Sequence, residues 1–218
     1  MRAVAPILAA ALAAGCTNLF HSDAKPEQTY VLRAPAAAPA QPAAVAGAAP
    51  LEALSAIQVL HPMTAPGLDV PHIILVQADH RMNFYVGSRW PAPLADVVES
   101  LAVDSLRGSG EWQSVQDSGS AFPVEYVLQI SVRRFEADYT AGGNPEVHVL
   151  LDCTVGARQG RELVSSFVAE GNAVAASDRM REVVAAFERA SGTALAALDT
   201  QTAAATRAYA AAHAGAAH

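Results

Sequence analysis

The chain has 218 residues, with 14 lysines and arginines against 21 aspartates and glutamates, and a formal net charge of −7 at neutral pH. Nucleic-acid binding requires lysine and arginine side chains clustered on phosphates, so we expect no nucleic-acid partner for this acidic chain. Its single lysine is Lys25. This excludes the GxxxxGK[ST] nucleotide-binding loop, because no lysine follows a glycine-rich turn.

Residues 1–15, MRAVAPILAAALAAG, combine one arginine with a run of small and apolar residues. The run is shorter than the roughly 20 apolar residues that span a bilayer. It has the pattern of a secretory signal peptide, in which a basic start and an apolar centre precede small residues at the cleavage site. The alternative is a short buried helix, but a polar and proline-rich segment follows it. We therefore predict a signal peptide over residues 1–15.

The apolar run ends at Cys16 and resembles a bacterial lipobox, although Ala13 stands where a large aliphatic residue is usual. The resemblance implies cleavage between Gly15 and Cys16, a diacylglycerol on the thiol and an N-acyl chain on the new amine. Several chains anchor firmly, since each buried methylene contributes about 0.8 kcal/mol. Thr17 is not the aspartate that retains lipoproteins at the inner membrane of enteric bacteria, which implies the periplasmic face of the outer membrane. The alternative is a disulfide between Cys16 and Cys153; otherwise Cys153 is a small buried hydrophobic residue.

The residues after the cysteine divide into a tether and a linker. Residues 16–28 are polar and lack periodicity, whereas 29–50 contain a short strand candidate, TYVLR, and then a segment of alanine and proline. That segment cannot bury enough apolar area to offset its ordering entropy, so we expect a linker. A loop of this length is unusual inside a compact domain. Either the domain begins near Leu51, or TYVLR belongs to it across the linker.

Residues 51–202 are predicted to form one domain, followed by an alanine-rich tail over 203–218. Apolar residues recur at three- and four-residue spacing in two segments, which predicts amphipathic helices over 93–107 and from Ser177 onward. Pro93 suits the start of the first helix and Gly108 suits its end. Short apolar runs bounded by turn residues predict strands, at 56–60, 72–77 and 82–86.

Three longer segments alternate between apolar and polar residues and predict an antiparallel meander, over 124–138, 147–155 and 163–170. Phe135 breaks the alternation, and a bulge near Arg133 and Arg134 would return it to the core. Two helices and this sheet predict a two-layer α+β fold. We expect a mixed, mostly antiparallel sheet with both helices on one face.

The sequence lacks the HExxH, CxxC and GxSxG motifs of common metal, redox and hydrolytic sites. His72 and His80 flank one strand candidate, and Asp138 and Asp152 lie on neighbouring strands. Scattered histidines and paired acids are more common without a metal or a catalytic role. We therefore predict no catalytic residue, no metal site, no enzymatic activity, and no cofactor beyond the acyl groups on Cys16.

The segment MNFYVGSRWPAPL, residues 82–94, is dense in the residue types of binding sites. Aromatic and arginine side chains are enriched in binding hot spots. We predict that it forms a partner or self-association surface, with seven contributing residues: Phe84, Tyr85, Arg89, Trp90, Pro91, Pro93 and Leu94. In the alternative, Tyr85 and Trp90 pack against the sheet and the prolines set the start of the helix.

In the order and spacing of its motifs, the chain resembles the ABC-type transport auxiliary lipoproteins, the PqiC-like family. The shared features are a lipobox, a Y-x-L strand, an alanine and proline stretch, a Leu-Asp loop, an R-W-x-x-P-L element, an R-F-E strand end and a closing helix. The motifs here are Tyr30–Leu32, Pro66–Asp69, Arg89–Leu94 and Arg134–Glu136. The loop 79–81 and the alanine-rich tail match no part of this pattern.

The resemblance implies a non-catalytic, lipid-anchored component of a transport system, whose ABC permease and ATPase and MCE-type (mammalian cell entry) substrate-binding protein are separate chains. The implied task is to help pass phospholipid or other apolar molecules between the two membranes, in support of envelope integrity. A ring or other homo-oligomer would suit such a conduit. The family also resembles the small domain that begins TolB-type proteins. Two other functions stay open: an outer-membrane lipoprotein that scaffolds or activates cell-wall synthesis, and a periplasmic hydrolase.

Overall fold

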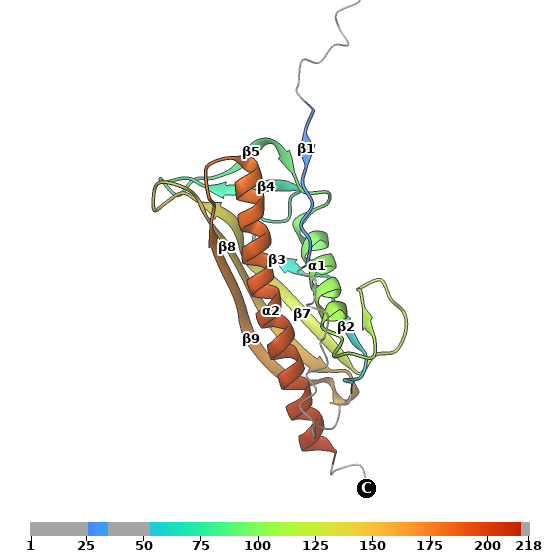
Figure 1. Ribbon diagram of the computed structural model, residues 1–218. Helices are drawn as coiled ribbons and strands as arrows, with labels where there is room; N and C mark the ends of the chain where they lie inside the picture. Colours follow the sequence, from blue (N-terminus) through green and yellow to red (C-terminus); the bar gives the residue numbers. More distant parts are fainter. Residues whose placement is uncertain (1–25, 35–52, 215–218) are drawn as a thin grey trace, which may run out of the picture.

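A computed structural model describes residues 26–34 and 53–214. The predicted signal peptide, the Cys16 anchor and most of the linker lie outside the described residues. Helices α1 (Leu94–Ser109) and α2 (Met180–His213) lie on one face of a nine-stranded sheet (Figure 1). This arrangement confirms the predicted two-layer α+β class. None of the helices in the described part of the chain is long and apolar enough to cross a membrane.

The sheet is organised around the long strand β7 (Tyr126–Asp138). On one side, β7 pairs antiparallel with β8 (Glu146–Ala157), and β8 pairs antiparallel with β9 (Glu162–Val174), which confirms the predicted meander. On the other side, three short strands follow one another along β7 and run parallel to it: β2 (Ile57–Val59), β3 (Met63–Thr64) and β4 (His72–Val76).

The remaining strands extend the sheet at its two ends. Strand β5 (Met82–Arg89) pairs antiparallel with β4, and β1 (Gln28–Thr29) pairs parallel with β5. Strand β6 (Val115–Gln116) pairs parallel with β2. Because β1 precedes the alanine and proline segment, the sheet includes residues from before the linker, and the domain does not begin at Leu51.

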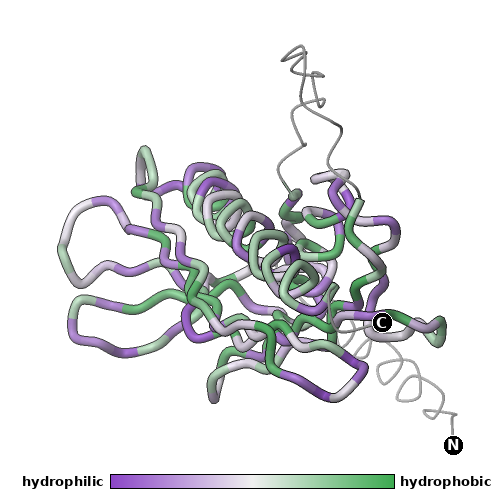
Figure 2. The backbone as a smooth tube through the Cα atoms, turned by 90° about the horizontal axis from the view of Figure 1, so that it is seen from below, coloured by the Kyte–Doolittle hydropathy of each residue, from purple (hydrophilic) through white to green (hydrophobic). Residues whose placement is uncertain are grey.

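The core lies between the helices and the facing side of the sheet. Every second residue of β8 is buried, as expected for a strand covered on one face. The register of β7 against β8 shifts between Val132 and Arg134, which confirms the predicted bulge, and Phe135 is buried beyond it. Figure 2 shows both hydrophobic and hydrophilic residues along the helical coils. The buried residues of each helix recur at three- and four-residue spacing, so each helix covers the sheet with one face.

Helix α2 lies directly on β9 because Gly171 has no side chain. A Cβ atom at Gly171 would come within 2.0 Å of the carbonyl oxygen of Ala190 and 2.9 Å of the amide nitrogen of Ala194. Glycine within a strand commonly marks such a close backbone approach. Alanines on the facing side of the helix are also buried. Small residues on both elements therefore set the short distance between α2 and the sheet.

Both helices extend beyond their predicted ends. Helix α2 continues to His213 without a break, and Thr202 and Thr206 are buried in it, so the boundary predicted between domain and tail falls within a packed helix. Helix α1 continues past Gly108 and ends at Gly110, which adopts a φ of 68°. The left-handed conformation at a helix C-terminus favours glycine, and the glycine that ends α1 is Gly110 rather than the predicted Gly108.

Candidate functional site

The motifs of the predicted binding segment and the Leu-Asp loop meet where α1 begins. Pro93 occupies the N-cap position, and its side chain offers no hydrogen-bond acceptor. Asp69 supplies the missing acceptor: its Oδ1 accepts a hydrogen bond from the amide N–H of Ala95 at 3.2 Å. A carboxylate at this position satisfies one of the free N–H groups of the first turn and matches the helix dipole. Leu68, beside Asp69, is buried in the core.

Trp90 forms an aromatic cluster with Phe135 and Phe187. Its ring centroid lies 5.2 Å from that of Phe187 and 6.2 Å from that of Phe135, both edge-on, while the two phenylalanines stack at 5.3 Å. The aromatic residues of the R-W and R-F-E motifs therefore pack together under α2. Aromatic pairs in these geometries add about 0.5–1.5 kcal/mol beyond the area that they bury.

The prediction of a surface is wrong for Trp90 and Leu94, each of which is 1 % exposed. Strand β5 ends at Arg89, and the backbone N–H of Trp90 donates to the carbonyl of Pro71 at 2.7 Å, which turns the indole into the core. Pro91 is exposed. For Trp90, the alternative of packing against the sheet describes the structure.

Tyr85 is also turned away from open solvent. Its hydroxyl lies 2.8 Å from that of Tyr139, which in turn donates to Asp178 at 2.5 Å. Burial and these hydrogen bonds raise the pKa of Tyr85 above its ordinary value, and burial and the bond to Asp178 raise the pKa of Tyr139 to about 12. Both phenols stay protonated at neutral pH, and the chain of hydrogen bonds ties the β4–β5 hairpin to the segment before α2.

Strand β5 presents three apolar side chains to solvent, which we call the β5 stripe: Met82, Phe84 and Val86. Their exposed fractions are 48 %, 41 % and 98 %. The residues alternate along the strand, so their side chains lie on one face. Arg89 follows at the end of the strand, with its guanidinium 3.4 Å from Glu27. Phe84, Arg89 and the exposed prolines are the parts of the predicted surface that solvent reaches.

Met82 and Val86 were missed as surface residues, although the alternation of the MNFYV run was visible in the sequence. The alternation showed that the strand has two faces but not which face the rest of the domain covers. Residue type led us to predict Trp90 as a surface residue, because tryptophan is enriched in binding sites. Tryptophan is also a large core residue, and only packing distinguishes these roles. The partner-binding role of the exposed residues stays a prediction.

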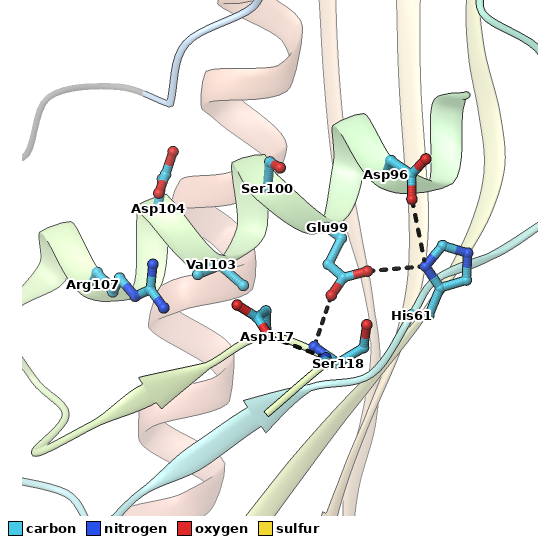
Figure 3. Close-up of a pocket in the computed structure, with 10 residues that line it drawn as sticks. His61, Asp96, Glu99, Ser100, Val103, Asp104, Arg107, Asp117 and Ser118 are labelled. Carbon is cyan, nitrogen blue, oxygen red and sulfur yellow. Dashed lines mark hydrogen bonds and ion pairs between the residues drawn. The ribbon is translucent and has the colours of Figure 1, made fainter. Parts of the chain in front are cut away.

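A polar pocket of about 410 Å³ lies beside α1 and brings together residues distant in sequence (Figure 3). His61 follows β2, Asp96 and Glu99 lie on α1, and Ser118 lies in the loop after β6. Glu99 Oε2 lies 2.9 Å from His61 Nδ1, and Glu99 Oε1 accepts the N–H of Ser118 at 2.8 Å. Burial tends to raise the pKa of Glu99, but the Ser118 N–H and His61 outweigh it and hold that pKa below its ordinary value.

No motif in the sequence pointed to this pocket. The only local signal was the three-residue spacing of Asp96 and Glu99, which places both carboxylates on one helix face. Two pairs were noted in the sequence, His72 with His80 and Asp138 with Asp152. Neither pair is linked by a hydrogen bond in the described part of the chain. Asp152 bonds to Arg133, whereas Asp138 lies opposite Glu146 farther along β7.

Among the described residues Cys153 has no disulfide partner; it lies within the core, and burial raises its pKa to about 12. A thiol with this pKa is protonated and poorly reactive at neutral pH. This agrees with its predicted role as a small buried hydrophobic residue. Cys16, its alternative disulfide partner, lies outside the described residues.

Comparison with known proteins identifies relatives of the whole domain. A family model described as "ABC-type transport auxiliary lipoprotein component" matches residues 30–212. A crystal structure of a DUF330-family protein from Xanthomonas campestris is similar with a TM-score of 0.65 and 23 % identity, over 84 % of this chain and 96 % of that one. A crystal structure of an uncharacterised protein is similar with a TM-score of 0.57 and 14 % identity, over 69 % and 99 % of the two chains. At these identities the solved structures show the fold alone. No curated protein matches the chain.

Proposed function

The chain belongs to the family of ABC-type transport auxiliary lipoproteins, and from this we propose that it is the lipid-anchored, non-catalytic partner of an MCE-type transport complex. The family match over residues 30–212 carries the proposal. In this role the protein helps to move phospholipid or other apolar molecules between the inner and outer membranes. ATP hydrolysis belongs to a separate chain, consistent with the single lysine of this sequence.

We further propose that Cys16 anchors the protein to the periplasmic face of the outer membrane, after cleavage behind Gly15. Eleven residues separate Cys16 from β1, which begins at Gln28. Even fully extended, they would span only about 40 Å. The domain would therefore stay near its own membrane, and the other components would have to reach it.

The β5 stripe is our proposed contact with the MCE-type protein. Exposed apolar groups flanked by charges are typical of protein–protein interfaces, in which an apolar centre is surrounded by a polar rim. Here the apolar centre is formed by Phe84 and Val86, and the rim by Arg89 and Glu27. Self-association through the same stripe would give the homo-oligomer that suits a conduit.

Affinity purification of the tagged, detergent-extracted protein tests the function, with mass spectrometry of the chains that co-purify. We expect an MCE-type protein and its permease. The double substitution Phe84→Ala and Val86→Asp should reduce their recovery, whereas Val174→Asp, at a site on β9 that is 57 % exposed, should not. Recovery of cell-wall synthases instead would favour the scaffold function. Trp90→Ala is unsuitable here, because the indole is buried.

Metabolic labelling tests the anchor separately. We expect incorporation of radiolabelled palmitate into the unsubstituted chain and none into the Cys16→Ala variant. Labelling that survives this substitution would contradict the anchor without affecting the family assignment.

A further inference from the structure

We propose that His61, Asp96 and Glu99 form a binding site for one divalent transition-metal ion, with Zn²⁺ as the best match. His61 Nδ1 and one carboxylate oxygen from each acid all lie within 4.8 Å of one another. The side chains converge from α1 and from the segment after β2 (Figure 3). A metal ion at this site would be independent of the transport function proposed above.

The distances from His61 Nδ1 to the two carboxylates bracket what Zn²⁺ requires, and the two carboxylate oxygens lie within 4.8 Å of each other. Zn²⁺ binds histidine nitrogen and carboxylate oxygen at about 2.0–2.2 Å in tetrahedral sites, so two ligand atoms of one ion lie about 3.4 Å apart. His61 Nδ1 lies 2.9 Å from Glu99 Oε2 and 3.9 Å from Asp96 Oδ1. Because the two distances lie on either side of the required value, small side-chain rotations would make room for the ion.

The ligands are carried by elements that the core holds in place. Asp96 and Glu99 are three residues apart on α1, and the opposite face of this helix is buried in the core. His61 comes two residues after the last residue of β2, whose three residues are all buried. Pro62 favours an extended backbone at His61, because a residue before proline is disfavoured in the helical region. Sites on helices and strands hold their geometry better than sites on loops, which favours the two ligands on α1, while His61 lies in the three-residue connection between β2 and β3.

Glu99 is also oriented by a contact outside the ligand set. The N–H of Ser118 donates to its Oε1, which leaves Oε2 directed at His61. Such outer contacts fix the orientation of metal ligands and contribute to affinity. The side chain of His61 is 54 % exposed, which provides a path for the ion and room for water at the fourth position.

The charge of the pocket favours a dication. Arg107 is the one arginine or lysine that lines it, and its guanidinium donates to the carbonyl of Val115 at 3.1 and 3.0 Å. Clefts lined by one sign of charge concentrate ions of the opposite sign. A histidine ligand favours Zn²⁺ over Mg²⁺ and Ca²⁺, which prefer oxygen ligands alone. Carboxylates outnumber this arginine in the lining of the pocket, which contains four: Asp96, Glu99, Asp104 and Asp117.

Titration of the metal-free, detergent-solubilised full chain with ZnCl₂ tests the site, with heat of binding as the readout and Co²⁺ absorption as a second probe. We expect one saturable site that His61→Ala removes. Asp96→Asn, at an exposed position that should not affect folding, should weaken binding about tenfold or more. The matched control is His148→Ala, which should keep the binding. His148 Nε2 also lies near two carboxylates, 3.8 Å from Glu146 and 4.0 Å from Asp138, but outside the proposed site.

A second control separates ligation from general attraction. Asp104 lines the same pocket but is not one of the three ligands, so Asp104→Asn should weaken binding much less than Asp96→Asn. The proposal is overturned if the unsubstituted chain shows no saturable site, or if Asp96→Asn leaves Zn²⁺ affinity unchanged. It is also overturned if Asp104→Asn weakens binding as much as Asp96→Asn, because the pocket would then act only through its net charge.

Discussion

Apolar residues are buried where α2 packs on the sheet, whereas several are exposed on the β4–β5 hairpin. Under α2, backbone atoms approach so closely that Gly171 cannot carry a Cβ atom, and the rings of Trp90 and Phe135 are enclosed. On the hairpin, Val86 is 98 % exposed although valine is as apolar as many core residues. An apolar residue type therefore does not show by itself whether the side chain is buried. The tertiary structure decides whether another part of the same chain covers it.

The largest expected effect comes from filling the contact between α2 and β9. Gly171→Ala should lower the free energy of unfolding by about 4 kcal/mol or more, because its Cβ would overlap a backbone oxygen that no rotamer change can move. Gly156→Ala on β8 is the matched control, since its nearest contact would be an ordinary 3.4 Å. Chemical denaturation of both variants measures the difference, and equal stabilities would contradict the close approach.

Removal of the indole from the aromatic cluster should be nearly as costly. Trp90→Ala should lower the free energy of unfolding by about 3–4 kcal/mol, through lost burial and the cavity left beside Phe135 and Phe187. Arg89→Ala, one residue away, should cost less than about 1 kcal/mol because its side chain is partly exposed. A similar loss in both variants would mean that Trp90 is not the core residue of this segment.

A smaller effect, of opposite sign, is expected at Asp199 between the two helices. Its Oδ2 accepts from Ser105 at 2.7 Å, and burial raises its pKa to about 6. The folded chain therefore keeps a proton that the unfolded chain releases near pH 3.8, so this residue lowers stability as the pH rises from about 4 to 6. Asp199→Asn should raise the free energy of unfolding by about 1 kcal/mol at pH 7.5. The gain is this small because solvent screens the partly exposed carboxyl group. Denaturation at pH 4 should show no such gain.

The smallest change in stability is expected on the β5 stripe. Val86→Asp should alter the free energy of unfolding by less than about 0.5 kcal/mol, because the side chain is already in solvent. Val149→Asp, at a buried position of β8, should prevent folding by placing an unpaired charge in the core. Denaturation curves compare the two, and a large loss for Val86→Asp in the isolated protein would show that the stripe is already covered.

Regular patterns predicted the frame of the molecule. Alternation over β7, β8 and β9 predicted the meander, and the break in phase at Phe135 predicted a bulge that the register confirms. Helical spacing predicted α1 and α2, because a helix covered on one side needs a stripe of apolar residues. Ends were predicted less well, since alanine continues a helix as readily in a tail as in a packed segment.

The sequence by itself determined the two-layer class, the order of the long elements and the family pattern, because these depend on periodicity and on motifs within short segments. The tertiary structure alone decided that Trp90 is enclosed while Val86 is exposed. It also brought His61 to Asp96 and Glu99. The physical reason is the same in both cases. Burial and electrostatic contacts depend on elements that are distant in the chain, and a local pattern shows which residues seek a partner but not which partner they meet.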